Sequence, residues 1–225
     1  MRPDTVMIFA AGFGRRMGDL TADRPKPLLS VAGRTLLDRT RDLVREAGIS
    51  RTVVNAHYLA DQIAAHLQDT DCIVLQESPS ILDTGGGLKA AVPVLGDAPV
   101  FTANPDVIWS GPNPFTFLAN AASTENEATL LLVPIEQTTG SNSGDFDLID
   151  GRPCRKGNYL YTGVQIIRPQ AAAAERDTVF SLNRVWDRLI ARDTLGAVLY
   201  PGMWHDVGSP AGLTRAEALF ASSAV

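Results

Sequence analysis

The stretch "TVMIFAAGFGRRMGDL" at residues 5–20 decides the fold, because it joins an apolar run to a glycine-rich loop. The run at 5–11 predicts a buried strand, and Gly12 and Gly14 follow it, where the chain leaves the strand. Backbone amides at a turn between a strand and a helix can approach a ligand closely and suit phosphate. Taken alone, a glycine turn that binds nothing remains the alternative.

Strand-like and helix-like segments alternate through the first half of the chain. Further strands are expected at 51–56, 71–77 and 98–104, and helices at 35–48, 59–67 and 86–95, the last limited by Pro93. This order predicts a single α/β domain over 1–225, Rossmann-like, with a mostly parallel, mixed sheet and helices on both faces. Ligands of such sheets lie at the carboxyl ends of the strands, so the loops after Ala10, Gln76 and Ala103 are expected to form the site.

The second half is less regular. Strands are expected at 128–135 and 159–169, and a helix at 181–193 with Ser181 as its N-cap. The stretch 138–153 is polar and rich in turn residues, and 196–221 predicts a strand, a loop and a terminal helix. A small subregion over about 140–168 is expected at one edge of the sheet.

Composition excludes several classes of partner. The 225 residues carry a formal charge of −5 and their basic residues are scattered, so no nucleic acid partner is expected. No run of about 18 apolar residues occurs, which predicts a cytoplasmic chain without a membrane partner. Cys72 and Cys154 lie far apart without a CxxC pattern, so no zinc site is expected.

The connection after the first strand carries several cations between prolines. Pro25 and Pro27 prevent a continuous helix, and Arg16 and Lys26 stand at fixed positions on this loop. Such cations suit a triphosphate, although a lone lysine beside prolines can equally be a solvated charge. A dinucleotide oxidoreductase is a remote alternative, because Gly18 falls one place late for that fingerprint and the second strand ends without an acid.

These residues resemble a known family. "AAGFGRRM" at 10–17, followed by "RPKPL" at 24–28, is similar to the signature of the sugar-1-phosphate nucleotidyltransferases. Further matches follow in the family's order, at "VAGRTLLD" (31–38), "LDTGGGLKAA" (82–91), "NPDV" (104–107), "GDF" (144–146), "YTGVQI" (161–166) and "WHDVGSP" (204–210). The compact length and "DTGGG" most resemble the branch that acts on N-acetylmuramic acid 1-phosphate in peptidoglycan recycling.

The resemblance implies a nucleotidyltransferase (GT-A-like) fold and a Mg²⁺-dependent transfer of a uridylyl group from UTP to a sugar-1-phosphate. Reactants and leaving group are anionic, so positioning and charge neutralisation carry such a reaction. It implies Arg16 against the departing pyrophosphate and Lys26 between the two reacting phosphates. Asp106 and Asp206 would hold Mg²⁺, although each alone could be a turn or capping aspartate.

The resemblance also assigns binding residues. The nucleotide would contact the backbone at Ala11, Gly12 and Gly14 and the side chain of Glu77. Backbone groups around Asp83, Thr84 and Gly85 would read the edge of a pyrimidine, which favours UTP over GTP. The sugar-side residues are Asn104, Asp145, Thr162, Gly163 and Asn183.

Two departures from the family pattern leave alternatives open. Arg15 stands where relatives carry Thr, Ser or Glu, and Pro105 precedes Asp106 where relatives carry Gly or Thr. Pro105 could re-aim Asp106, so a nucleotide-sugar binding protein without turnover is one alternative. Another sugar-1-phosphate, or phosphocholine with CTP, is the other. The lack of a long C-terminal extension favours a monomer or weak homodimer.

Overall fold

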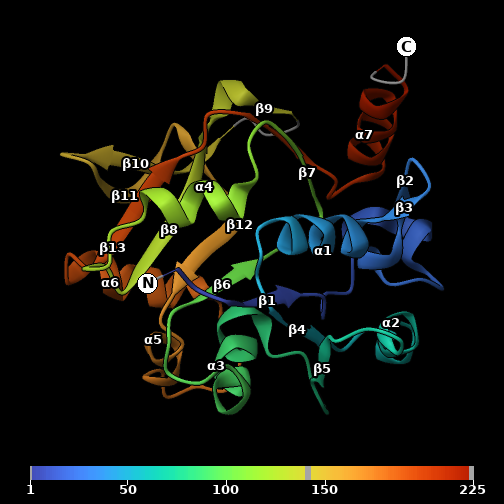
Figure 1. Ribbon diagram of the computed structural model, residues 1–225, viewed down its shortest axis with the longest axis horizontal. Coiled ribbons are helices and arrows are strands. Elements are labelled where there is room, and N and C mark those ends of the chain that lie inside the picture. Colours follow the sequence, from blue (N-terminus) through green and yellow to red (C-terminus); the bar gives the residue numbers. More distant parts are fainter. Residues whose placement is uncertain (1, 140–142, 223–225) are drawn as a thin grey trace.

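A central mixed sheet organises the whole chain (Figure 1). The computed structural model describes residues 2–139 and 143–222. The sheet's strands are β1 (Thr5–Phe9), β4 (Arg51–Ala56), β5 (Ile73–Gln76), β6 (Val100–Ala103), β8 (Ala128–Pro134), β10 (Gly144–Ile149), β11 (Arg152–Gly157), β12 (Tyr159–Ile167) and β13 (Leu195–Leu199). The order along it is β11-β10-β12-β6-β1-β4-β5, and β8 pairs with both β12 and β13.

The N-terminal half of this sheet is parallel, and the C-terminal half is mixed. Strands β6, β1, β4 and β5 run parallel to one another, whereas β12 is antiparallel to both β6 and β8. The predicted mixed α/β sheet is thereby confirmed. Because the four parallel strands end at the same edge, the loops that follow β1, β5 and β6 are brought together.

Two small sheets complete the strands. β7 (Val107–Ser110), β14 (Met203–Asp206) and β9 (Thr138–Thr139) form one, and β2 (Ser30–Val31) and β3 (Arg34–Thr35) form the other. The antiparallel pair of β7 and β14 joins the segment after β6 to the last part of the chain.

Seven α-helices and three short 3₁₀ turns lie in the described part of the chain. The helices are α1 (Leu36–Glu46), α2 (Ala60–Leu67), α3 (Asp83–Leu95), α4 (Pro114–Ala121), α5 (Gln170–Ala173), α6 (Leu182–Ala191) and α7 (Pro210–Ser222). The 3₁₀ turns are η1 (Arg15–Thr21), η2 (Lys26–Leu28) and η3 (Ile135–Gln137). Within the described residues, none of the helices has the length and apolar character that crossing a membrane requires.

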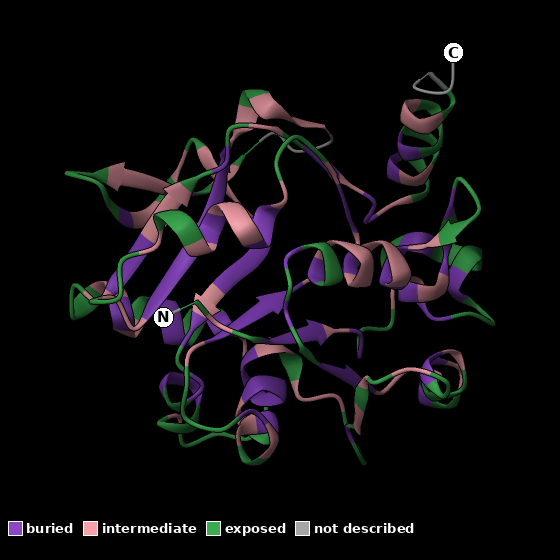
Figure 2. Ribbon diagram, in the orientation of Figure 1, coloured by how far each residue is buried: buried purple, intermediate pink, exposed green. Residues whose placement is uncertain are grey.

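The alternation of side chains along β1 places helices on both faces of the sheet. Val6 and Ile8 belong to the buried cluster that includes α1, α2 and α4, whereas Met7 belongs to the cluster of α3, α5 and α6. Successive strand residues point to opposite faces, so one strand contributes to both cores. Figure 2 shows the buried sheet between helices whose outer sides are exposed.

Most of the expected elements are confirmed, including the helix at 181–193, whose N-cap Ser181 accepts from the amide of Asn183. The expected start of the third helix, at residue 86, was wrong, whereas its expected end at residue 95 is confirmed. α3 begins at Asp83 and continues past Pro93 to Leu95. Pro93 removes one amide donor from the last turn, and the helix ends two residues after it.

The stretch 138–153 is not simply turns, and here the sequence reading was wrong as well. It contains β9, β10 and the start of β11, joined at Asp150 and Gly151, which both have positive φ angles. Asp-Gly with positive φ at both residues forms a tight hairpin turn. The expected subregion at 140–168 lies partly outside the described residues, at 140–142; the rest forms β10, β11 and β12.

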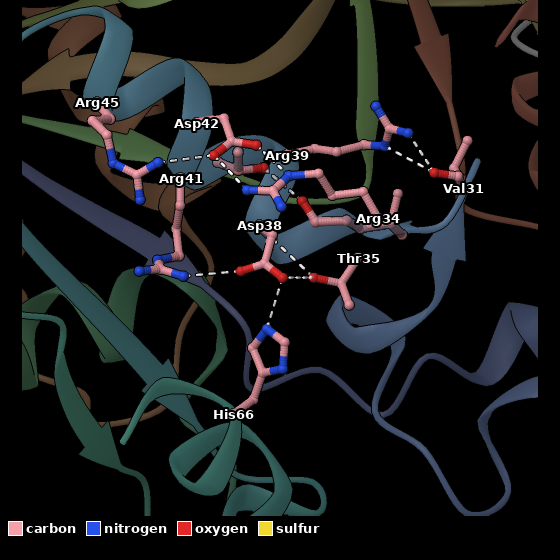
Figure 3. Close-up of polar contacts among 11 residues, drawn as sticks. Val31, Arg34, Thr35, Asp38, Arg39, Arg41, Asp42, Arg45 and His66 are labelled. Carbon is pink, nitrogen blue, oxygen red and sulfur yellow. Dashed lines mark hydrogen bonds and ion pairs between the residues drawn. The ribbon is translucent and has the colours of Figure 1, made fainter. Parts of the chain in front are cut away.

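α1 and α2 are tied through the carboxylate of Asp38 (Figure 3). It accepts from Thr35 Oγ1 at 2.8 Å and from Arg41 Nη1 at 2.9 Å, and it lies 2.9 Å from Nε2 of His66. Burial raises the pKa of the Asp38 carboxyl, but the Thr35 hydrogen bond, the charge of His66 and the Arg41 hydrogen bond outweigh it and leave this pKa lowered.

We therefore expect Asp38→Asn to destabilise the fold by about 1–2 kcal/mol at neutral pH. Because the pKa of Asp38 is lowered in the folded state, its contribution is complete above the unfolded value of about 3.9 and is lost as pH falls through the folded value. Urea unfolding at several pH values measures this, with exposed Asp69→Asn as the control. A difference between wild type and Asp38→Asn that stays constant down to the most acid pH contradicts the account.

Candidate active site

A cavity of about 630 Å³ opens at the carboxyl ends of the parallel strands. The loops after β1, β5 and β6 all line it, which confirms the expectation that these three loops share one site. Its lining includes the predicted residues Ala11, Gly12, Gly14, Arg16, Lys26, Glu77, Asp83, Thr84, Asn104 and Asp106.

A buried chain of hydrogen bonds fixes the floor of this cavity. Asn55, at the end of β4, accepts from the amide of Ala10 at 2.9 Å and donates to Glu77 Oε1 at 2.6 Å. The other oxygen of Glu77 accepts from the amide of Leu82 at 2.8 Å. Asn55 and Glu77 are 3% and 6% exposed. These bonds tie the ends of three strands to the entrance of α3.

The Glu77 side chain lines the cavity and is held from within the protein. Both carboxylate oxygens are engaged inside the protein, so the side chain shapes the cavity wall, while a role next to the base or ribose stays a prediction. A Cβ at Gly87 would lie 2.7 Å from Glu77 Oε1 and 2.9 Å from Asn55 Nδ2. Glycine at this position lets α3 approach the hydrogen-bond chain.

Sequence reasoning missed Asn55, although a signal was present. A polar amide stands near the end of an otherwise apolar strand, at "RTVVNA". A buried asparagine must satisfy both a donor and an acceptor, which makes it suited to link two neighbouring strand ends.

The two predicted catalytic cations each pair with one of the two predicted metal ligands. The turn closes through a hydrogen bond from the Met17 amide to the Gly14 carbonyl at 2.8 Å, with Gly14 at a φ of +65°. The Lys26 side chain is 12% exposed and forms an ion pair with Asp106. The Arg16 side chain is 70% exposed, and its Nη1 lies 3.7 Å from Oδ2 of Asp206.

The pairing of β14 with β7 brings the two predicted metal ligands to one place. Asp206 stands opposite Val107, and the amide of Val207 donates to the carbonyl of Asp106 at 2.9 Å. Oδ1 of Asp206 accepts from the amide of Gly208 at 2.8 Å. The hydrogen bond from Val207 holds the main chain at Asp106, the residue directly after Pro105.

The donor chemistry at this point fits magnesium. Across residues 2–139 and 143–222, no cluster of three or more His, Cys, Asp or Glu side chains could hold a metal by itself. Mg²⁺ is commonly held by one or two carboxylates, with water and substrate phosphate oxygens completing its shell. Asp106 and Asp206 meet that requirement.

A second cavity of about 270 Å³ adjoins the first and shares Phe9, Asp83, Thr84 and Asn104 with it. Asp145 and Asn183, which were predicted on the sugar side, both line this smaller cavity together with Tyr161, Ser181 and Trp186.

Thr162 and Gly163 line neither of these two cavities. The Thr162 side chain is fully buried and donates to the Leu131 carbonyl at 2.8 Å. The Gly163 carbonyl accepts from the amide of Asn104 at 3.0 Å. Gly163 thus holds the backbone of Asn104, and a role of Thr162 and Gly163 in sugar binding stays a prediction.

Several backbone amides at the start of α3 have acceptors within the protein. The amides of Gly85 and Gly86 donate to the Phe180 carbonyl at 2.9 and 3.0 Å, and the Thr84 amide donates to Asp83 Oδ1 at 2.6 Å. The first amides of a helix need acceptors, and the protein supplies them here. The amide of Gly85 is thus engaged within the protein, and the reading of a pyrimidine edge by other backbone groups of this segment stays a prediction.

Arg15, the other departure from the family pattern, lies at the rim of the larger cavity. Its guanidinium lies 5.2 Å from the centre of the Phe13 ring, which also contacts the rings of His57 and Tyr58. Cation–π contact accounts for the position of this side chain. No sequence signal had singled out Phe13.

Comparison with known proteins gives matches along nearly the whole chain. Residues 6–192 match the family described as the MobA-like NTP transferase domain. The N-acetylmuramate alpha-1-phosphate uridylyltransferase of Caulobacter vibrioides is 37% identical over 98% of both chains. The protein with the same name from Neisseria meningitidis serogroup B is 33% identical over 95% of this chain and 96% of that protein.

Among solved structures, the inositol-1-phosphate CTP transferase from T. maritima superposes with a TM-score of 0.82. The superposition covers 98% of this chain and 96% of that structure. The two sequences are 18% identical, so the match supports the fold.

We expect Glu77→Gln to destabilise the fold by about 1–3 kcal/mol, because glutamine cannot accept from both Asn55 and Leu82 and one buried donor is left without a partner. Thermal unfolding measures this loss, with exposed Glu125→Gln as the control. Equal stability of Glu77→Gln and wild type would show that the hydrogen-bond chain does not hold the cavity floor.

Proposed function

The chain belongs to the MobA-like NTP transferase family, and we propose that it transfers a uridylyl group from UTP to N-acetylmuramate 1-phosphate, with release of pyrophosphate. The observation that carries this proposal is the cavity at the strand ends that Arg16, Lys26 and Asp106 line, with Asp206 held beside it by its ion pair with Arg16 and by the pairing of β14 with β7. Identities of 37% and 33% over nearly the full length to two uridylyltransferases of that specificity support the choice of substrates.

The residues divide the work of the reaction between them. An oxygen of the sugar phosphate attacks the α-phosphorus of UTP, and the bond from that phosphorus to the β-phosphate oxygen breaks. Arg16 neutralises the pyrophosphate that leaves, since a guanidinium binds phosphate in a forked manner. Lys26 holds the α-phosphate and the sugar phosphate together, which turns an encounter between two anions into a reaction of neighbours.

Asp106 and Asp206 would hold Mg²⁺, which when bound supplies positive charge to phosphate oxygens as a Lewis acid. In this arrangement, the ion pair of Lys26 with Asp106 keeps the ammonium group at the edge of the sheet where the phosphates would bind. The Arg16 side chain is largely exposed, so it has room to move with the departing group.

The two adjoining cavities fit a nucleotide and a sugar. The larger one contains the glycine loop and the cations, as the triphosphate requires. The smaller one combines the rings of Tyr161 and Trp186 with polar side chains, a lining that suits a sugar. Asn104, Asp83 and Thr84 border both, so the reacting phosphates would meet beside them.

The alternative of a binding protein without turnover rested on Pro105. The hydrogen bond from Val207 to the Asp106 carbonyl favours a fixed, productive aspartate over a displaced one. A monomer or weak homodimer stays a prediction.

Pyrophosphate release tests the proposal directly. Purified protein with Mg²⁺ is given UTP, CTP, GTP or dTTP, each with N-acetylmuramate 1-phosphate, N-acetylglucosamine 1-phosphate, glucose 1-phosphate or phosphocholine. We expect the highest kcat/KM for UTP with N-acetylmuramate 1-phosphate. Lys26→Met should lower it by about 10²–10³-fold, and exposed Lys156→Met should not.

A higher kcat/KM for another pair would replace the proposed substrates. Tight UTP binding without any pyrophosphate would support the binding protein instead.

A further inference from the structure

We propose that Arg155 is a positioning residue of the sugar site, which fixes the side-chain amide of Asn183 so that it presents an N–H donor to a sugar oxygen. The inference rests on the proposed function in one respect, the assignment of the smaller cavity to the sugar. Arg155 itself is not among the residues that line this cavity.

The guanidinium of Arg155 forms a fork of three hydrogen bonds with residues near the start of α6. From β11, its Nη1 donates to Asn183 Oδ1 at 2.9 Å and its Nη2 donates to the Asn183 carbonyl at 2.8 Å. Nε donates to Asp187 Oδ1 at 2.6 Å. One arginine thus holds both the backbone and the side chain of Asn183.

Aromatic rings keep the guanidinium in this place. Its central carbon lies 4.8 Å from the ring centre of Phe146 and 5.5 Å from that of Trp186. Phe146 is fully buried, and Trp186 is buried and lines the smaller cavity. Stacking on two rings restricts an otherwise flexible side chain, so the fork is formed before a ligand arrives.

The chemistry of arginine decides which way the Asn183 amide faces. A guanidinium only donates, so the atom in contact with it must be Oδ1 and not Nδ2. On the other side, Nδ2 donates to Ser181 Oγ at 3.1 Å. A carboxamide nitrogen carries two hydrogens, and the second one is the group that Asn183 can offer in the cavity it lines.

The smaller cavity therefore contains groups of opposite hydrogen-bonding character. Asn183 supplies a donor for a hydroxyl or carbonyl oxygen of the sugar. Asp145 supplies a carboxylate, whose Oδ2 already accepts from the Tyr161 amide at 3.0 Å. Without Arg155, the Asn183 amide could rotate and offer either character, and the preference for an acceptor on the sugar would be lost.

Calorimetric binding of UDP and of UDP-N-acetylmuramate separates the sugar contribution from the nucleotide contribution without any turnover. We expect Arg155→Gln to weaken UDP-N-acetylmuramate binding about tenfold, as the loss of one oriented hydrogen bond implies, and to leave UDP binding within about twofold. Arg155→Lys should restore part of the loss, because lysine can donate to Oδ1 but cannot form the fork.

Arg152→Gln is the matched control. Arg152 also lies on β11 and also bonds an aspartate and an asparagine, with its Nε 3.2 Å from Asp193 Oδ1 and its Nη1 donating to Asn126 Oδ1 at 2.9 Å. None of these three residues lines either cavity. In thermal unfolding, Arg152→Gln should lose about as much stability as Arg155→Gln. It should keep wild-type binding of UDP and of UDP-N-acetylmuramate.

A double-variant cycle tests whether Arg155 acts through Asn183. In an Asn183→Ala background, Arg155→Gln should have no further effect on UDP-N-acetylmuramate binding. The inference is overturned by unchanged UDP-N-acetylmuramate binding in Arg155→Gln, by an equal loss for UDP, or by a full tenfold loss that persists in the Asn183→Ala background. Failure of wild type to release pyrophosphate would instead count against the proposed function, because this comparison needs no catalysis.

Discussion

The antiparallel pairing of β14 with β7 is the constraint on which the site depends. Asp106 follows β6, whereas Asp206 lies about 100 residues further along the chain. The register nevertheless places Asp206 opposite Val107, and the Val207 amide donates to the Asp106 carbonyl. Without this pairing, each aspartate would be an isolated turn residue. With it, the two carboxylates pair with Lys26 and Arg16, and the two halves of the chain meet where we propose that the reaction takes place.

A second constraint shapes the space in front of these charges. Asn55 and Glu77 join the ends of β1, β4 and β5 to the entrance of α3 through buried hydrogen bonds. Buried polar groups of this kind stabilise a structure only when every partner is in place, so they also fix the relative positions of the strand ends. Glycine at the start of α3 permits the close approach that the hydrogen bonds require. The resulting cavity is rigid at its floor and open on the side of Arg16.

The sequence predicted the framework and the charged residues of the site better than their contacts. Alternating apolar segments predict the strands and helices, and the rule for parallel sheets selects the three loops that line the larger cavity. The resemblance pointed to Lys26, Asp106 and Asp206 as site residues. No sequence pattern reveals that Lys26 pairs with Asp106, or that the Phe180 carbonyl accepts from the amides of Gly85 and Gly86. Asn55 and Arg155 went unnoticed because their roles depend on residues 22 or more positions away, which local propensity does not report.

The central claim is that Asp106 and Asp206 act as one metal site that the nucleotide completes. Electron paramagnetic resonance of Mn²⁺, titrated into the protein with a non-hydrolysable UTP analogue, tests it most directly. The account predicts about one bound Mn²⁺ per chain, at least about tenfold weaker binding in Asp106→Asn and in Asp206→Asn, and unchanged binding in Asp145→Asn. Wild-type affinity for Mn²⁺ in Asp206→Asn would contradict it, because the strand pairing would then bring together two carboxylates that do not share a metal.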